Sequence, residues 1–371
     1  MSGVPPGGAL PGGVLPGGVL PGGVLVVGTG LLGTSIGLAL RRAGIRVHLR
    51  DHDPAALAEA AARGAGSPES PSAPVDLAVV AVPPARTGAV VAELLEAGTA
   101  AYATDVASVK VLPARDVAAR TAAAARYVGG HPMAGREVSG PAAAVVDLVQ
   151  GRPWVVCARP GSDPEAAARV TALARACGAQ PVSMPAEEHD AAVALVSHAP
   201  HLVASLVAAR LRGAPEQEVG LAGQGVADVT RVAAGDPRLW ADILGANAAA
   251  VRDVLVDLRS DLEAAVLALD RRDPAALTDL LEAGVAGRAR LPGKHGGRQT
   301  AFATLPVVVQ DRPGQLAQLF ADAGAAGVNV EDVRIEHVQG IPTGVVEIAV
   351  RPGSDEVLAR ALRSRGWTVH R

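Results

Sequence analysis

A histidine and a serine have the chemistry and the placement of a proton-transfer pair. His131 follows the short strand expected at 127–130, and an unperturbed histidine titrates near neutral pH, which suits a proton acceptor. Ser108 follows the strand expected at 101–104, and its hydroxyl could orient the same substrate group. The competing interpretations are a histidine that caps a loop and a serine that caps the next helix. We predict that His131 is a general base and that Ser108 assists it.

A second group of polar residues lies in a later region rich in Ala, Val and Leu. Ser197 and His201 have i, i+4 spacing, which places them on one face of a helix. Arg231 has apolar neighbours, where a guanidinium suits bidentate binding of a carboxylate, although a solvated Arg on a helix surface is the alternative. His198 and His201 come with no HExxH pattern and no cysteine pair, so we predict no metal site.

The stretch at 24–33, VLVVGTGLLG, predicts a site for a dinucleotide. An apolar run leads into a GxGxxG turn and then into a segment typical of a helix packed on a sheet. In such a unit Gly28 permits the sharp turn, Gly30 lets the backbone approach a pyrophosphate, and Gly33 lets helix and strand pack closely. The phosphates would then lie at the helix N-terminus, where free N–H groups favour anions.

Asp51 bears on the choice of cofactor. It ends the next expected strand, about 20 residues beyond the glycines, where this fold places a partner for the ribose hydroxyls. A carboxylate there would repel a 2′-phosphate and favours NAD, while the neighbouring Arg50 and His52 leave NADP open. The predicted cofactor-binding residues are Gly28, Gly30, Leu31, Gly33 and Asp51.

The composition excludes several classes of protein. The 371 residues carry a net charge of −3 with no basic run, which argues against nucleic acid or an anionic membrane as the main partner. The uncharged stretch before Arg41 is broken by Gly-Thr-Gly and contains Thr34 and Ser35, whereas a membrane span needs about 20 mostly apolar residues. No positive region precedes it, as a signal peptide requires, and two cysteines make no disulfide framework. We therefore expect a cytoplasmic protein.

The order of elements predicts an α/β protein in several parts. Strands alternate with helices up to about residue 185, which predicts a Rossmann-type doubly wound parallel sheet. Helical periods without strands follow, and this all-helical part is expected to bind substrate and form a homodimer. The last part has the order βαββαβ. The predicted parts are a low-complexity flexible extension with PGGVL repeats (1–21), an NAD-binding domain (22–185), a helical domain (186–290), a linker (291–300) and a small C-terminal domain (301–371).

Four segments, in this order behind GxGxxG, resemble the prephenate dehydrogenase family of tyrosine biosynthesis. They are DVASVK (105–110), GGHPMAGRE (129–137), SHAPH (197–201) and DVTRVAAGDPRLW (228–240). The C-terminal part, with DRPG at 311–314, resembles an ACT domain, a small-molecule sensor often fused to enzymes of amino-acid metabolism.

The resemblance implies a reaction and roles for individual residues. His131 would accept the proton of the substrate's ring hydroxyl while Ser108 orients that hydroxyl. Hydride would pass to NAD, and loss of the ring carboxylate as CO2 would make the ring aromatic, giving 4-hydroxyphenylpyruvate. The residues implied to line the substrate pocket are Ser197, His201, Arg231 and Trp240.

Three alternatives stay open on sequence grounds. Arogenate dehydrogenase acts on the same scaffold, and Asp228 could supply the ammonium partner that arogenate needs. Homoserine dehydrogenase also joins a Rossmann domain to an ACT domain but would require a mixed sheet in place of the helices at 186–290. A non-catalytic amino-acid sensor is the third. The ACT-like part also implies feedback by an amino acid, with tyrosine binding near Asp311, Gly314 and Asn329 across an interface between two copies; a tail used only for oligomerisation is the alternative.

Overall fold

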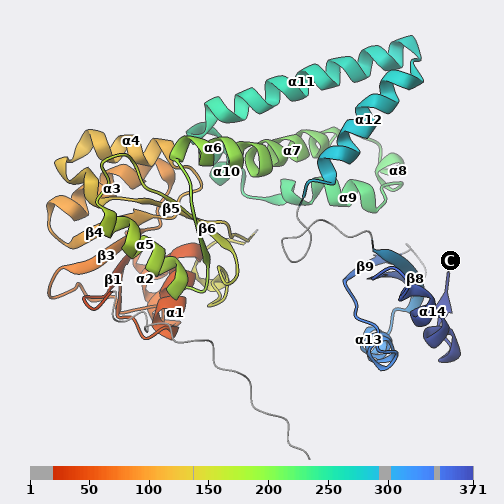
Figure 1. Cartoon of the computed structure of the whole chain (residues 1–371), viewed down its shortest axis with the longest axis horizontal. Helices are drawn as coiled ribbons and strands as arrows, with labels where there is room; N and C mark the ends of the chain where they lie inside the picture. Colours follow the sequence, from red (N-terminus) through yellow and green to blue (C-terminus); the bar gives the residue numbers. More distant parts are fainter. Residues whose placement is uncertain (1–19, 137, 292–301, 338–342, 371) are drawn as a thin grey trace, which may run out of the picture. The chain divides into compact units, whose positions relative to one another are not determined.

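The structure, a computed structural model, describes residues 20–136, 138–291, 302–337 and 343–370. Contacts group the chain into two units, Met1–Arg259 and Ser260–Arg371 (Figure 1). The extension predicted at 1–21 and the linker predicted at 291–300 lie outside the described residues, apart from residues 20, 21 and 291. The predicted domain boundaries therefore stay predictions.

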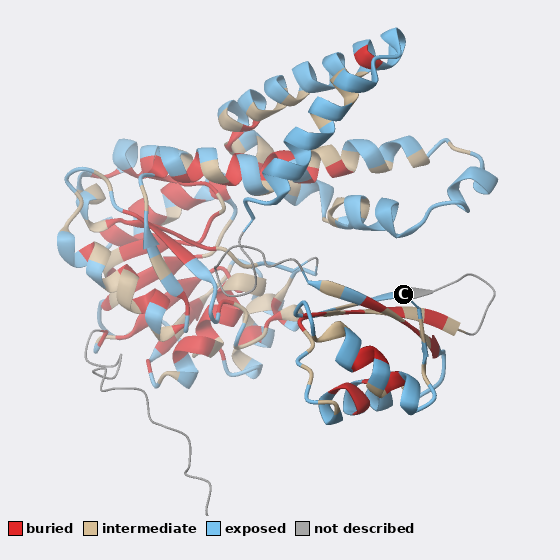
Figure 2. Ribbon diagram, turned by 45° about the vertical axis from the view of Figure 1, so that its right-hand side comes forward, coloured by how far each residue is buried: buried red, intermediate tan, exposed pale blue. Residues whose placement is uncertain are grey.

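A four-stranded parallel sheet forms the centre of the first unit. Its strands, in the order β2-β1-β3-β4, are β1 (Val24–Val27), β2 (Val47–Arg50), β3 (Val75–Val80) and β4 (Ala100–Asp105). The connecting helices are α1 (Leu31–Arg42), α2 (Pro54–Ala62) and α3 (Pro84–Glu96). Val24 and Val26 belong to the core on one face and Leu25 and Val27 to the core on the other. Because both faces are covered, the strands of this sheet are largely buried (Figure 2). β1 is apolar and buried throughout and β3 is apolar except for Asp76, whereas β2 and β4 also contain polar and half-buried residues.

The register of this sheet places the candidate residues at one edge. Val27, Val80 and Asp105 pair across β1, β3 and β4, so these strands end together, and Arg50 at the end of β2 pairs with Val27. The loops that begin with Gly28 and Val106 therefore leave the same carboxyl edge, where ligands of such sheets bind.

A second sheet corrects the prediction of one parallel doubly wound sheet. Its strands, in the order β5-β6-β7, are β5 (Gly129–Pro132), β6 (Pro153–Cys157) and β7 (Gln180–Ser183), flanked by α4 (Val111–Arg120) and α5 (Pro164–Ala176). β5 and β6 are antiparallel because the chain between them has only a short 3₁₀ turn (Pro141–Ala143) in its described residues, and a parallel return requires a full crossover. A single parallel bridge, Ala103 to Tyr127, joins this sheet to β4.

The region after β7 consists, as predicted, of helices joined by short turns, with no strand among its described residues up to 291. A mixed sheet, which homoserine dehydrogenase would require here, is not present in these residues. The helices are α6 (Ala186–Val193), a π-helical turn (Ala194–His198), α7 (Ala199–Leu211), α8 (Glu216–Val219), α9 (Gln224–Thr230), the 3₁₀ turn η5 (Arg231–Ala234), α10 (Pro237–Ala246), α11 (Ala248–Arg271) and α12 (Pro274–Arg288).

Two of the breaks between the helices of this region lie at glycines and at an asparagine. The glycines at 220 and 223 separate the short helices α8 and α9. Asn247 ends α10, and α11 begins at the next residue.

One continuous helical stretch, Ala186–Leu211, is long and apolar enough to cross a membrane by length and composition alone. Its polar residues His189, Asp190 and His198 are buried and hydrogen-bonded to other parts of the first unit. These contacts attach the first half of the stretch to other elements of the first unit.

The second unit contains the predicted order βαββαβ. Its elements are β8 (Ala303–Gln310), α13 (Gln315–Ala325), β9 (Asp332–His337), β10 (Thr343–Val350), α14 (Asp355–Ser364) and β11 (Thr368–Val369). The antiparallel sheet has the order β11-β8-β10-β9. Alternate residues of β8 and β10 are buried, and they form one core with α13 and α14.

Candidate active site

The turn between β1 and α1 has the geometry of a dinucleotide cradle. Gly28 has φ +97°, and a Cβ there or at Gly33 would overlap a backbone carbonyl oxygen, that of Ala81 or of Gly28. A Cβ at Gly30 would have no neighbour within 4 Å, so the backbone there faces open space. Leu31 begins α1, with Gly30 at its N-cap. These residues fit a pyrophosphate on the first turn of α1.

Asp51 lies beside this turn, at the end of β2. Its carboxylate accepts hydrogen bonds from the Thr29 backbone N–H and from Thr29 Oγ1, the latter at 2.8 Å. Burial raises its pKa, but hydrogen bonds from the Asp53 and Thr29 amides outweigh burial and hold the pKa below the usual value. Asp51 is therefore ionised at neutral pH and faces the cradle as an acceptor of hydrogen bonds.

His131 lies at the end of β5 and is buried. Its Nδ1 is 2.8 Å from Nε2 of His189, on α6. Burial, with Lys110, His189 and His198 nearby, holds the pKa of His131 well below the usual value. The imidazole is therefore neutral at physiological pH, as a proton acceptor must be.

The two glycines before His131 are required by close packing. A Cβ at Gly130 would lie 2.7 Å from the Asp105 carbonyl oxygen and 2.9 Å from Trp154 Nε1. At Gly129 a Cβ would lie 3.1 Å from Lys110 Cδ. Glycine at both positions lets β5 approach the end of β4.

A buried ion pair occupies the space next to these glycines. The Lys110 ammonium contacts the Asp105 carboxylate and donates to the Gly130 carbonyl at 2.5 Å. Tyr127 donates its hydroxyl hydrogen to Asp105 at 2.5 Å, and the Ala107 amide donates to it at 2.8 Å. Lys110 and Asp105 are 1% and 0% exposed, so this pair is a fixed part of the interior that joins β4 to β5.

Asp190 connects this cluster to the helical region. Its two carboxylate oxygens accept the backbone amides of Lys110 at 2.7 Å and Val111 at 2.9 Å. His189 Nδ1 is 2.8 Å from Asp190 Oδ1. Ser108, half-buried, lies two residues before Lys110 in the same loop. One carboxylate thus holds both the histidine behind His131 and the loop that carries Ser108.

Asn247 and His198 extend the network. Asn247 Nδ2 donates to the Asp190 carbonyl at 2.8 Å and lies 3.1 Å from His198 Nδ1. Burial lowers the pKa of His198 to about 4, although Asp190 opposes the shift. His198 ends the π-helical turn, a feature frequent at functional sites.

The other predicted substrate residues form a second cluster. The rings of His201 and Trp240 are stacked, with centroids 3.5 Å apart and planes at 12°. Arg231 is exposed and begins η5, which packs against α7, the helix of His201. Ser197 is half-buried in the π-helical turn. Ser197 and His201 lie on one continuous helical stretch, and the ring contacts of Trp240, on α10, with His201 and His198 bring it to the same region.

Comparison with known proteins identifies the family. Residues 36–183 match the family description "prephenate dehydrogenase, nucleotide-binding domain", and residues 185–283 match "prephenate dehydrogenase, dimerization domain". The probable prephenate dehydrogenase NovF of Streptomyces niveus is 41% identical over 348 residues, which cover 91% of this chain and 96% of that protein. The chain belongs to the prephenate dehydrogenase family.

Solved structures agree with this assignment. The prephenate dehydrogenase of A. aeolicus, in complex with hydroxyphenyl propionate and NAD+, has a TM-score of 0.63 and 26% identity, covering 71% of this chain and 96% of that chain. The arogenate dehydrogenase of Synechocystis has a TM-score of 0.59 and 25% identity, covering 71% and 98%. The predicted family, function, Rossmann-like domain and NAD cofactor are therefore confirmed, and the chain is an NAD-dependent oxidoreductase.

In this member of the family, sequence reasoning missed two residues of the site. His189 and Asp190 were not predicted, because adjacent residues of a helix diverge by about 100° and form no motif by spacing. The available signal was a His-Asp pair at the start of an apolar helix, since apolar surroundings make such polar residues expensive unless they are paired.

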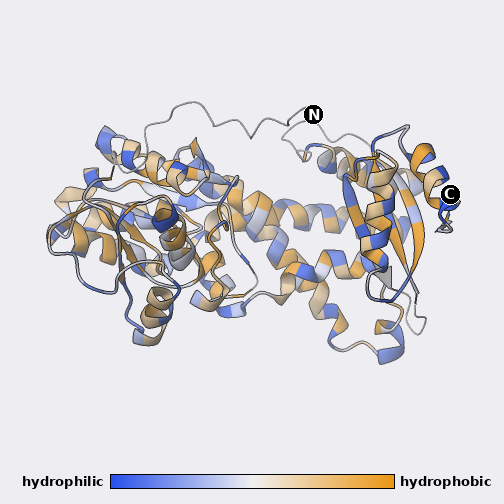
Figure 3. Cartoon of the chain, turned by 90° about the horizontal axis from the view of Figure 1, so that it is seen from below, coloured by the Kyte–Doolittle hydropathy of each residue, from blue (hydrophilic) through white to orange (hydrophobic). Residues whose placement is uncertain are grey.

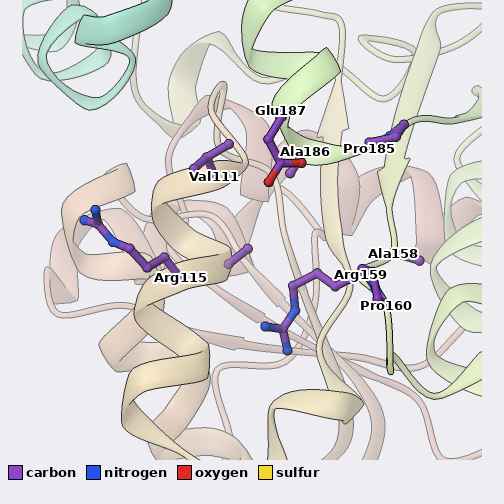
Figure 4. A pocket seen from close by; sticks show the side chains of 9 residues that line it. Val111, Arg115, Ala158, Arg159, Pro160, Pro185, Ala186 and Glu187 are labelled. Carbon is purple, nitrogen blue, oxygen red and sulfur yellow. The ribbon is translucent and has the colours of Figure 1, made fainter.

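A cavity of about 440 Å³ lies beside the site, lined by α4, by the loop after β6 and by the start of α6 (Figure 4). Arg115, Arg159 and Glu187 supply its charged side chains. His131 and Ser108 do not line it, so this cavity is separate from the predicted proton-transfer pair.

The predicted effector residues lie at two ends of a helix. Asp311 is exposed and Gly314 caps the N-terminus of α13, whereas Asn329 follows its C-terminus and donates to Glu331 at 2.8 Å. A helix of 11 residues is about 16 Å long. A single copy therefore does not bring these residues together.

Proposed function

We propose that the chain converts prephenate and NAD into 4-hydroxyphenylpyruvate, CO2 and NADH, and that His131 is the general base. The observation that carries this proposal is the neutral, buried His131 at the carboxyl end of β5, held through Nδ1 by His189. Because Nδ1 is engaged, Nε2 is the nitrogen left to accept a proton. His131 is given no other hydrogen-bond partner by the described residues.

The proposed proton path begins at the ring hydroxyl of the substrate. His131 takes this proton while Ser108 orients the hydroxyl. Bound NAD would accept the hydride from the ring carbon that carries this hydroxyl. The ring carboxylate leaves as CO2, and the electron pair of the broken C–C bond completes the aromatic ring. The proton held by His131 then returns to the ring oxygen, which becomes the hydroxyl of 4-hydroxyphenylpyruvate. Aromatisation makes the reaction effectively irreversible.

The substrate's remaining groups are assigned to the second cluster. Arg231 binds a carboxylate, Ser197 and His201 bind polar groups, and Trp240 shapes the pocket. Burial lowers the pKa of His201, so at neutral pH its ring offers a hydrogen bond without a positive charge. The flat stack of His201 on Trp240 is a rigid surface for a ring-shaped substrate.

Arogenate is the second candidate substrate, favoured by the similarity to the Synechocystis arogenate dehydrogenase. It differs from prephenate in carrying an ammonium group where prephenate has a keto group. Asp228, exposed on α9, is the residue assigned to such a group; its carboxylate accepts from Gln224 Nε2 at 2.9 Å.

The test is formation of NADH, followed by absorbance, with purified protein, NAD and either prephenate or arogenate. Turnover with prephenate alone supports the proposal. Turnover with arogenate alone keeps the base and cofactor and replaces the substrate. Absence of turnover with either substrate would contradict both proposed activities, prephenate and arogenate dehydrogenase, and would favour the non-catalytic sensor.

We further propose a homodimer formed by the helical region. Several of its helices contain many hydrophobic residues (Figure 3). Those with exposed side chains include Leu206, Val207, Leu262, Val266, Leu269, Leu281 and Val285. The family description of residues 185–283 as a dimerization domain supports this. Light scattering should give twice the chain mass, and Leu281→Glu with Val285→Glu should give the monomer.

The third proposal is that residues 301–371 are an ACT-like regulatory domain that binds tyrosine. Its support is the βαββαβ order with the turn Asp311–Gly314 before α13. Because α13 separates Gly314 from Asn329, one tyrosine would contact both only across two copies. Added tyrosine should inhibit turnover and raise the Tm, and Asp311→Ala should abolish both effects; unchanged activity and Tm with wild-type protein would contradict the proposal. The cytoplasm remains the proposed location.

A further inference from the structure

Three buried side chains form a continuous chain of hydrogen bonds behind the proposed base. His131 Nδ1 is 2.8 Å from His189 Nε2, and His189 Nδ1 is 2.8 Å from Asp190 Oδ1. The three residues are 9%, 1% and 4% exposed. Water is therefore largely excluded from these contacts, and each ring nitrogen must donate or accept according to its protein neighbour.

The direction of each bond follows from Asp190. Its Oδ1 and Oδ2 each accept a backbone amide, from Lys110 and Val111, as ionised carboxylate oxygens do. A carboxylate can only accept, so His189 Nδ1 carries the hydrogen. With its ring hydrogen on Nδ1, His189 presents Nε2 as a lone-pair acceptor, and this atom accepts from His131 Nδ1.

We propose that His189 and Asp190 are positioning residues that fix His131 in its Nδ1–H tautomer and so leave the Nε2 lone pair for the substrate proton. This inference rests on the proposed role of His131 as the base. A neutral histidine in water, without such hydrogen-bond partners, populates both tautomers. The Nε2–H tautomer cannot accept a proton at Nε2, the nitrogen that faces away from His189.

Asp190 performs a second task through the same carboxylate. By holding the amides of Lys110 and Val111, it fixes the end of the loop that carries Ser108 relative to His189. Asn247 in turn donates to the Asp190 carbonyl, which restrains the Asp190 backbone from α10. The tautomer of the base and the position of the assisting serine thus depend on one residue of α6.

The decisive pair of variants is His189→Gln and His189→Met. The two side chains are close in size and neutral, but only glutamine offers an oxygen that can accept from His131 Nδ1–H. His189→Met should lower kcat about 100-fold, within the range found when a catalytic histidine loses its orienting partner. His189→Gln should recover most of this loss. The KM for prephenate and the Kd for NAD should change little in either. The Tm should fall in His189→Met, which leaves His131 Nδ1 without its buried partner, and should stay nearer to wild type in His189→Gln.

The tautomer itself is read from the ring ¹⁵N resonances of His131, assigned by their absence in His131→Asn. In wild type, Nδ1 should be protonated and Nε2 unprotonated; in His189→Met both nitrogens should move toward the averaged shifts of mixed tautomers. The measurement is made between pH 7 and 8, above the lowered pKa of His131; the charged and titratable groups that face its ring are Lys110, His189 and His198.

These readouts separate this inference from the proposed function. A wild-type His131 protonated at Nε2, or a His189→Met variant with wild-type tautomer and kcat, overturns the inference even if prephenate is turned over. Absence of turnover with the expected ¹⁵N pattern overturns the reaction and leaves the tautomer assignment standing. Equal losses of kcat in His189→Gln and His189→Met would assign His189 a packing role only, which also overturns it.

Discussion

The dinucleotide cradle and the His131 cluster are built in opposite ways. The cradle comes from one continuous stretch, where Gly28, Gly30 and Gly33 are required by backbone conformation and close approach within a single turn. The His131 cluster joins the end of β4, the end of β5, α6 and Asn247, which are far apart in sequence. A site built from one continuous stretch depends on the backbone conformations that each of its residues can adopt. A site assembled from distant segments depends on buried polar groups, which are costly unless each finds a hydrogen-bond partner.

The largest expected effect is on rate, from His131→Asn in the assembled site. Loss of a general base costs about 10²- to 10⁴-fold in kcat. Because asparagine is polar and smaller, the Kd for NAD and the Tm should remain near wild type, since the cradle is separate. A kcat within about threefold of wild type would show that another group takes the proton.

Lys110→Met tests whether the assembled site also supports the fold. It would leave the buried Asp105 carboxylate without its cation, and breaking a buried pair in this way costs about 3–5 kcal/mol. Denaturant unfolding measures the loss. The double variant Lys110→Met with Asp105→Asn removes the unpaired charge and should be more stable than Lys110→Met alone; the reverse order of stability would contradict the importance of the pair.

A matched pair of glycine variants tests the cradle. Gly33→Ala places a methyl group against the Gly28 carbonyl oxygen and should destabilise the first unit by about 1–3 kcal/mol. Gly30→Ala has open space and should leave the Tm unchanged while weakening NAD binding, because its methyl group occupies the approach to the pyrophosphate. Calorimetry of NAD binding and thermal unfolding check both. Equal Tm losses in the two variants would contradict this division of roles.

The smallest expected effect is on the dependence of stability on pH. Burial lowers the pKa of His131, His198 and His201, with His198 at about 4. An unfolded histidine has a pKa of about 6.5, so the unfolded chain binds more protons below that value. The contribution of these neutral histidines to the free energy of unfolding is therefore fully present above about pH 6.5 and is lost as the pH falls toward 4.

Asp51, beside the dinucleotide cradle, affects the dependence of stability on pH in a different range. Asp51 has a lowered pKa, so its contribution is present above the usual carboxyl value of about 3.9 and is lost only below it. The Tm should therefore be flat from about pH 7 to 8 and fall between about pH 6.5 and 5. His198→Gln should fall less steeply than wild type over that interval. An identical slope would assign the acid sensitivity to other groups.

Much of the fold was predictable because its signals are local. The two central strands of the first sheet, β1 and β3, are apolar runs that only Asp76 interrupts, and the alternating burial of β8 and β10 follows from a sheet covered on one face. The predicted residues His131, Ser108, His201 and Trp240 could be named from motifs. Their roles stay predictions, to be tested as described.

The wrong sheet prediction and the two missed site residues have one physical origin, which is dependence on contacts between residues far apart in the sequence. The antiparallel pairing of β5 with β6 depends on how the chain returns between 133 and 152, and strand sequences do not encode their partner's direction. His189 and Asp190 were missed because their importance comes from His131 and from the amides of Lys110 and Val111, none of which is near them in sequence.

The sequence by itself determined the cradle, the succession of strands and helices and the family, because backbone requirements and apolar periodicity act over a few residues. Only the tertiary structure decided which polar groups meet: Lys110 with Asp105, Asp190 with the loop of Ser108, and His189 with His131. The reason is that a buried polar group must find a partner in space, and the fold alone determines which residue that partner is.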